Sequence, residues 1–307
     1  MTEITPIEEK EENKFLSIAK LIISPFRLMH FLPVMTVTTL IGILTYFSIG
    51  FLPIGPFITM VLSVFFQQAF VGIHNDYYDN QQDISYKKSK AIADGWVSAK
   101  TAFWFSIIFY IIFSGLSFGL GYYSNIGFWS VLYLQGINLI CLTYNFFLKN
   151  TPFSIVIYLI LFPTAPFFVW VNFENFAVFD WTKLWICAVM FFAAVIGHLA
   201  NEVPDYEFDI KYNKRNTAVL FGKKASTIIY VISSFLSQLI IIIPFALYFQ
   251  ELNYIVFIVV MSLSTLAGLG ALTMLWRNKW ETNNLVFNMF TGHIGINAIG
   301  IVLLLSI

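Results

Sequence analysis

The nonapeptide Asn75-Asp76-Tyr77-Tyr78-Asp79-Asn80-Gln81-Gln82-Asp83 ends a long apolar run, and its pattern occurs twice in the chain. The second copy is Asn201-Glu202-Val203-Pro204-Asp205-Tyr206-Glu207-Phe208-Asp209, again at the end of an apolar run. Each copy has an amide, a carboxylate at the next position, and carboxylates four and eight positions after the amide. Steps of four place side chains on one side of a helix. The pattern therefore predicts two helices, each with a row of polar groups along one side.

These two acidic motifs concentrate negative charge beside hydrocarbon. The first holds three and the second four of the chain's 17 acidic residues, seven in all. Carboxylates in such surroundings are costly unless a cation neutralises them. A lone Asp-x-x-x-Asp is usually a solvated helix face, but two copies with the same spacing favour a metal site. Mg²⁺ held by one or two carboxylates and completed by phosphate oxygens fits this pattern.

The composition is that of an integral membrane protein. The chain has 307 residues, of which 58% are hydrophobic and 11% are charged, whereas soluble domains carry about 25% charged residues. The net charge of zero argues against a nucleic-acid partner. Cys141 and Cys187, the two cysteines, both lie in apolar runs, which argues against a disulfide framework or a cysteine-based metal site.

Apolar runs long enough to cross a bilayer, about 20 residues each, recur along the chain. They predict nine transmembrane helices, near 26–50, 52–74, 101–122, 126–148, 153–172, 182–200, 226–249, 253–276 and 285–306. We expect residues 1–25 to be a polar tail with a short interfacial helix, and residues 26–307 to be one nine-helix domain. The motifs start at Asn75 and Asn201, four spans apart. This spacing suggests two similar four-helix halves plus a ninth helix.

The basic residues orient this arrangement. With the N-terminus inside, 16 of the 17 lysines and arginines fall on inner segments and only Lys183 falls outside, as the positive-inside rule requires. Both acidic motifs then face the cytoplasm at the cell membrane. Basic residues near the motifs suit a diphosphate. A diphosphate attached to a lipid tail would place its head at the motifs and its tail in the bilayer. Loss of diphosphate from an allylic tail would leave a carbocation, which apolar and aromatic walls can shelter from water.

At these motifs the chain resembles the UbiA superfamily of membrane prenyltransferases. The resemblance implies nine helices around a central cavity and Mg²⁺-dependent transfer of a polyprenyl group from its diphosphate to an acceptor. It implies catalytic metal ligands at Asp79, Asp83, Asp205 and Asp209, with Asn75 and Asn201 in support.

Looser matches add substrate-binding residues. The resemblance implies this role for Lys90, Tyr144, Lys149, Lys214 and Arg215. Lys90 stands where many relatives have arginine, and lysine cannot grip a diphosphate with two parallel hydrogen bonds. Asn213 stands where relatives have glycine, and asparagine tolerates left-handed backbone better than most residues. His198, one turn before the second motif, is as readily a helix cap as a catalytic group.

The motif sequences look most like the menaquinone-pathway branch, whose aromatic acceptor is 1,4-dihydroxy-2-naphthoate. We therefore predict prenyl transfer to a quinone precursor. An archaeal-type geranylgeranylglyceryl phosphate prenyltransferase, with a lipid acceptor, and a prenyl diphosphate cyclase remain alternatives. A cation transporter that uses intramembrane acids is an alternative of another class, although the acids stand at span ends and the spans between are nearly free of charge.

Overall fold

The computed structural model describes residues 14–50, 53–86, 90–174, 181–247, 254–276, 292–294 and 296–297, and over these residues the regular structure is helical. The long helices are α1 (Lys14–Leu28), α2 (Phe31–Ile49), α3 (Ile54–Ser85), α4 (Ala99–Tyr123), α5 (Phe128–Thr143), α6 (Ser154–Phe173), α7 (Trp181–Glu202), α10 (Lys223–Leu247) and α11 (Tyr254–Trp276). The short segments are the π-helix η1 (Tyr144–Leu148), the 3₁₀ turn η2 (Val203–Asp205), α8 (Tyr206–Lys211) and α9 (Thr217–Phe221).

The predicted membrane class is confirmed. Within the described part of the chain, seven helical segments are long and apolar enough to cross a membrane. The predicted span 253–276 corresponds to α11, whose apolar stretch Phe257–Gly270 is shorter. The ninth predicted span, 285–306, lies outside the described residues except for short helical pieces at 292–294 and 296–297. The count of nine therefore stays a prediction.

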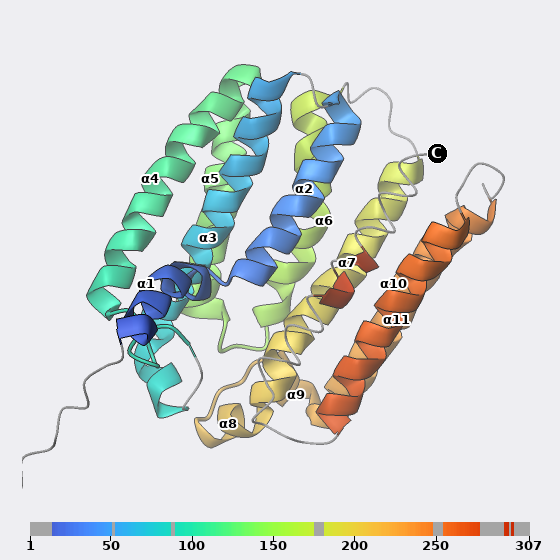
Figure 1. Ribbon diagram of the computed structural model, residues 1–307. Helices are drawn as coiled ribbons and strands as arrows, with labels where there is room; N and C mark the ends of the chain where they lie inside the picture. Colours follow the sequence, from blue (N-terminus) through green and yellow to red (C-terminus); the bar gives the residue numbers. More distant parts are fainter. Residues whose placement is uncertain are drawn as a thin grey trace, which may run out of the picture.

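The first span begins later than predicted. The sequence predicted a short interfacial helix within residues 1–25 and a span from residue 26, whereas α1 continues to Leu28 and α2 begins at Phe31. Between them His30 adopts left-handed backbone, with φ of 54°. The chain changes direction at this break, and α1 lies across the lower end of α3 (Figure 1).

The helices pack as one bundle in which α3 contacts α2 and α4, and α7 contacts α6 and α10. Its largest buried cluster includes Met60 of α3, Phe113 of α4 and Trp170 of α6. Burial of such side chains against one another favours close helix packing. The lower end of the bundle gathers the polar segments: the end of α3, the turn after α5, and α8 and α9 (Figure 1).

Candidate functional site at the lower end of the bundle

The first acidic motif lies on one continuous helix, as predicted. α3 extends without a break to Ser85, so Asp79 and Asp83 follow one another at successive turns on its buried side. The helix is 32 residues long, which at about 1.5 Å per residue is longer than a bilayer's hydrocarbon core. Its last turns therefore carry the motif beyond the apolar part of the span.

The second acidic motif is not on one continuous helix, and the prediction of a regular row there is wrong. α7 ends at Glu202, a 3₁₀ turn covers Val203–Asp205, and α8 starts at Tyr206. Pro204 explains the break, because proline has no N–H to donate and its ring clashes with the carbonyl four residues earlier. Asp209 is nevertheless buried on α8, and Asp205 is half-buried at the bend.

Lys149 pairs with the first motif from the far end of α5. Its ammonium donates to Asn75 Oδ1 at 2.8 Å and forms an ion pair with the Asp79 carboxylate. The π-helix η1 directly precedes Lys149, whose backbone N–H bonds to the carbonyl of Tyr144. The extra residue per turn in a π-helix changes the direction of the side chains that follow. The predicted grouping of Asn75, Asp79 and Lys149 is thus present.

Lys90 pairs with the same motif from the loop after α3. Its ammonium lies 2.7 Å from Asp76 Oδ1 and 2.9 Å from Asp83 Oδ2. Burial alone would lower the pKa of Lys90, but the carboxylates of Asp76, Asp83 and Asp79 raise that pKa above its ordinary value. Lys90 is therefore a permanent cation beside the motif at neutral pH.

Lys214 plays the corresponding part for the second motif. Its ammonium lies 3.1 Å from Asp209 Oδ1, and the amide of Asn216 donates to Asp209 Oδ2 at 2.7 Å. Asn216 also caps α9, because its Oδ1 accepts from the backbone N–H of Val219 at 3.0 Å. Asn213, just before Lys214, has φ of 55°. The expected left-handed backbone at this position is confirmed.

Tyr86 joins the two motifs. This buried residue directly follows α3, and its ring stacks on Phe208 of α8, with centroids 5.2 Å apart. The Lys214 ammonium lies 5.3 Å from the centroid of the same ring. Burial first, and then the negative charges of Asp209 and Asp205, raise the pKa of the Tyr86 hydroxyl. The ends of the two motifs are therefore neighbours in space although 126 residues separate their starts.

Three predicted site residues lie less centrally. The side chains of Asn201 and Arg215 are exposed, and the described contact of Arg215 is made by its backbone N–H, which donates to the carbonyl of Asn150 at 3.2 Å. Tyr144 is buried, with its ring centroid 5.5 Å from that of Tyr158. It lies one π-turn before Lys149.

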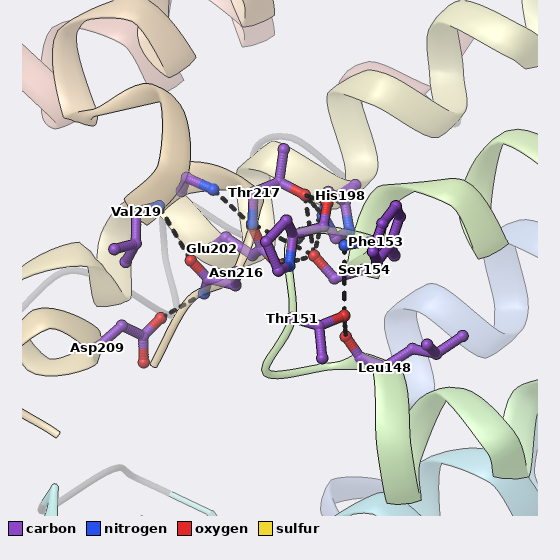
Figure 2. Close-up of polar contacts among 12 residues, drawn as sticks. Leu148, Thr151, Phe153, Ser154, His198, Glu202, Asp209, Asn216, Thr217 and Val219 are labelled. Atoms are coloured by element: carbon purple, nitrogen blue, oxygen red, sulfur yellow. Dashed lines mark hydrogen bonds and ion pairs between the residues drawn. The ribbon is translucent and has the colours of Figure 1, made fainter. Parts of the chain in front are cut away.

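A buried polar network next to Asp209 was missed by the sequence reasoning (Figure 2). It links the start of α6, the end of α7 and the start of α9 through Ser154, His198, Glu202 and Thr217. Two of its members were visible in the sequence: Glu202, the carboxylate directly after the motif amide, and His198, one turn before the motif. The partners from other helices, Ser154 and Thr217, gave no signal because only the fold brings them there.

The donor set fits Mg²⁺ in its chemistry. The motif side chains offer carboxylate and amide oxygens, the ligand type that Mg²⁺ prefers, and positive ammonium groups already occupy positions beside Asp79, Asp83 and Asp209. Among the described residues, no three carboxylate, histidine or cysteine side chains converge closely enough to chelate one ion. The aspartates would thus hold metal singly or in pairs, with other ligands completing the shell.

Fold and site together define a helical membrane protein with a mixed acidic and basic site at one end of its bundle. Residues 35–294 match the UbiA prenyltransferase family. The chain belongs to this family and is a prenyltransferase, so the resemblance inferred from the motifs is confirmed at the level of the family.

Individual relatives are more distant. Digeranylgeranylglyceryl phosphate synthase from Pyrococcus horikoshii is 27% identical over 196 residues, which is 64% of this chain and 67% of the relative. A solved structure concerned with digeranylgeranylglyceryl phosphate synthase shares 18% identity with a TM-score of 0.60, over 94% of this chain and all of that one. A UbiA homologue from Archaeoglobus fulgidus bound to GPP and Mg²⁺ shares 18% identity with a TM-score of 0.51, over 92% of this chain and all of that one.

Proposed function

We propose that this protein uses Mg²⁺ to transfer a prenyl group from a prenyl diphosphate to a glycerol-phosphate lipid. One observation carries the proposal: lysines from three separate segments meet the aspartates of both motifs at one end of a membrane bundle. Such a mixture of anions and cations suits a metal–diphosphate ligand, because each part of the ligand finds the opposite charge. The prenyl tail would extend along the apolar helices.

The residue roles that we propose combine the motif resemblance with the lysine–aspartate contacts. Asp79, Asp83, Asp205 and Asp209 would hold the metal, with Asn75 and Asn201 in support. When bound, Mg²⁺ stabilises the negative charge that develops on a departing diphosphate. Lys90, Lys149 and Lys214 each pair with an aspartate in this structure. With Mg²⁺ bound to the aspartates, the three ammonium groups would bind the diphosphate oxygens instead. Tyr144 and Arg215 would line the same site.

The transfer step is balanced without any further reactant. The bond between the allylic carbon and the diphosphate oxygen breaks, and its electron pair leaves with the diphosphate. A hydroxyl oxygen of the acceptor forms the new carbon–oxygen bond, and its proton passes to the released diphosphate. Lys149 and Lys90 serve this step by holding the leaving group in place and by offsetting its charge.

The choice of acceptor departs from the quinone precursor that the motif sequences suggested. The relative from Pyrococcus horikoshii is named digeranylgeranylglyceryl phosphate synthase, and this supports geranylgeranylglyceryl phosphate as the acceptor rather than a naphthoate. The local motif likeness to the menaquinone branch involves few positions, whereas the relative aligns over 196 residues. We therefore place the lipid acceptor first and keep 1,4-dihydroxy-2-naphthoate as the comparator.

An acceptor screen tests the proposal. Purified protein in detergent or liposomes is incubated with Mg²⁺, geranylgeranyl diphosphate and one acceptor at a time, and the products are identified by mass. We expect a prenylated glycerol-phosphate lipid and released diphosphate, both abolished by EDTA. A prenylated naphthoate that has lost carbon dioxide would instead restore the quinone branch.

Two further assays distinguish the cyclase and transporter alternatives. If diphosphate and a hydrocarbon form without any acceptor, the protein is a cyclase. If no diphosphate is released but a cation gradient drives uptake into proteoliposomes, it is a transporter. The distribution of basic residues supports a cytoplasmic site. An Arg215→Cys variant tests that placement, because a membrane-impermeant thiol reagent should label this exposed position in inverted vesicles but not in intact cells.

A further inference from the structure

Asp76 and Glu202 occupy the same position in the two acidic motifs, one residue after the amide. Both are buried, with 2% and 4% of their surface exposed. Neither belongs to the row of residues spaced by four, but on α3 Asp76 lies three residues before Asp79 and seven before Asp83, so it shares their broad face of the helix. What each carboxylate contacts is also the same in kind: a histidine, and the segment that follows its motif.

Asp76 ties the loop after α3 to the start of α2. Its Oδ1 accepts from His30 Nε2 at 2.8 Å and lies 2.7 Å from Lys90 Nζ. His30 stands at the left-handed break between α1 and α2. The carboxylate thus fixes Lys90 against a corner of the bundle, from which the same ammonium also reaches Asp83.

Glu202 ties the loop before α9 to the end of α7 (Figure 2). Its Oε2 accepts from the backbone N–H of Ala218 at 2.9 Å, and its Oε1 accepts from the Ser154 hydroxyl at 2.8 Å. His198 Nε2 lies 3.1 Å from the same Oε1. Through Ala218 the carboxylate fixes the start of α9, and with it the end of the loop that carries Lys214 and Arg215.

A nucleophilic triad does not explain this network. Ser154, His198 and Glu202 have exposures of 0%, 0% and 4%, so a substrate has no path to the serine. The serine hydroxyl donates to the glutamate itself rather than to the histidine as a base. In such a buried network each donor and acceptor supports a neighbouring bond, which is the behaviour of a structural tie.

We propose that Asp76 and Glu202 are a matched pair of positioning residues, each holding the basic segment that follows its motif over the diphosphate site. The inference rests on the proposed function for the identity of the ligand. It assigns Lys90 to Asp76, and Lys214 with Arg215 to Glu202. A charge is needed because each carboxylate serves at least two donors, and hydrogen bonds to a charged group are the stronger kind.

The isosteric variants Glu202→Gln and Asp76→Asn test the pair. An amide turns one acceptor into a donor, so in Glu202→Gln either the Ala218 N–H or the Ser154 hydroxyl loses its acceptor. Losing one such bond favours local opening by about 10- to 100-fold. Glu207→Gln is the matched control. Glu207 lies in the same motif, but its side chain is exposed and its Oε1 lies 3.7 Å from Lys223 Nζ, which is a weak ion pair.

Limited trypsin digestion with mass-spectrometric mapping measures how readily the segment around Lys90 and the segment around Lys214 and Arg215 each open. We expect Glu202→Gln to speed cleavage after Lys214 and Arg215 but not after Lys90, and Asp76→Asn to do the reverse. Both variants should weaken binding of inorganic pyrophosphate with Mg²⁺ and raise the KM for prenyl diphosphate. Glu207→Gln should match the wild type in each measurement.

These measurements distinguish selective loosening of one basic segment from general loosening of the protein. Equal acceleration at both segments in either variant indicates general loosening and overturns the proposal, as does wild-type cleavage together with wild-type pyrophosphate binding. If Glu202→Gln does not fold, Thr217→Val removes a hydroxyl that bonds Ser154 at 2.9 Å and should give the same selective cleavage at smaller amplitude. Cleavage and pyrophosphate binding need no turnover, so absent prenyl transfer would overturn the proposed function alone.

Discussion

The ring centroid of Tyr86 lies 4.6 Å from that of Tyr212. Tyr86 is the first residue after α3, and Tyr212 is the first residue after α8. This contact joins the ends of the two acidic motifs directly, and it brings Lys214 over the Tyr86 ring. This aromatic packing holds the ends of the two motifs together although their aspartates would repel each other.

Replacing Tyr86 should uncouple the two motifs. Tyr86→Ala removes a buried ring and should cost about 3 kcal/mol of stability, lower the thermal midpoint, and raise the KM for prenyl diphosphate. Tyr86→Phe keeps the ring contacts and should retain near-wild-type values. Differential scanning fluorimetry and steady-state kinetics measure both. Equal KM values for the alanine and phenylalanine variants would contradict a coupling role for the ring.

The proposed metal ligands should be essential for turnover and dispensable for folding. Asp79→Asn or Asp209→Asn should reduce the rate of diphosphate release by about 100-fold or more, because charge stabilisation in the transition state is lost. Thermal midpoints measured in parallel report on folding. The exposed acid replaced in Glu207→Gln should leave the rate unchanged. Full activity in either aspartate variant would remove that residue from the site.

Lys149 should compete with Mg²⁺ for the first motif. Lys149→Met removes the ammonium from Asp79 and Asn75, which should destabilise the protein by about 3 kcal/mol in the absence of metal, because a buried carboxylate loses its partner. Added Mg²⁺ should restore more of the thermal midpoint in Lys149→Met than in the wild type or in Lys149→Arg. If Mg²⁺ raises all three midpoints equally, the ammonium and the metal do not share Asp79.

The backbone at Asn213 sets the direction of Lys214. With φ of 55° at Asn213, a β-branched side chain is unfavourable, and Asn213→Val should cost about 1–2 kcal/mol. We expect that variant to raise the KM for prenyl diphosphate and to speed trypsin cleavage after Lys214. Asn213→Gly, which adopts the same φ without strain, is the control and should match the wild type. A valine variant with wild-type kinetics would show that the strain is absorbed elsewhere.

The sequence by itself determined the membrane class, the approximate positions of the spans and the pairing of two acidic motifs. These properties follow from local quantities: the length of an apolar run, and the period of polar residues along a helix. The left-handed backbone at Asn213 agrees with its resemblance to a glycine position of the family, which asparagine can also fill. The row of four-residue steps was right for α3, where nothing interrupts the helix, and wrong for the second motif, where Pro204 breaks it.

The tertiary structure decided which residues work together. Lys90, Lys149 and Lys214 come from three loops, and only the packing of α3 beside α5 and near α8 shows which aspartate each one meets. The same holds for Asp76 and Glu202, whose partners His30 and Ser154 lie 46 and 48 residues away. A carboxylate's role depends on which donors reach it through space, and hydrogen bonds act over about 3 Å regardless of sequence separation.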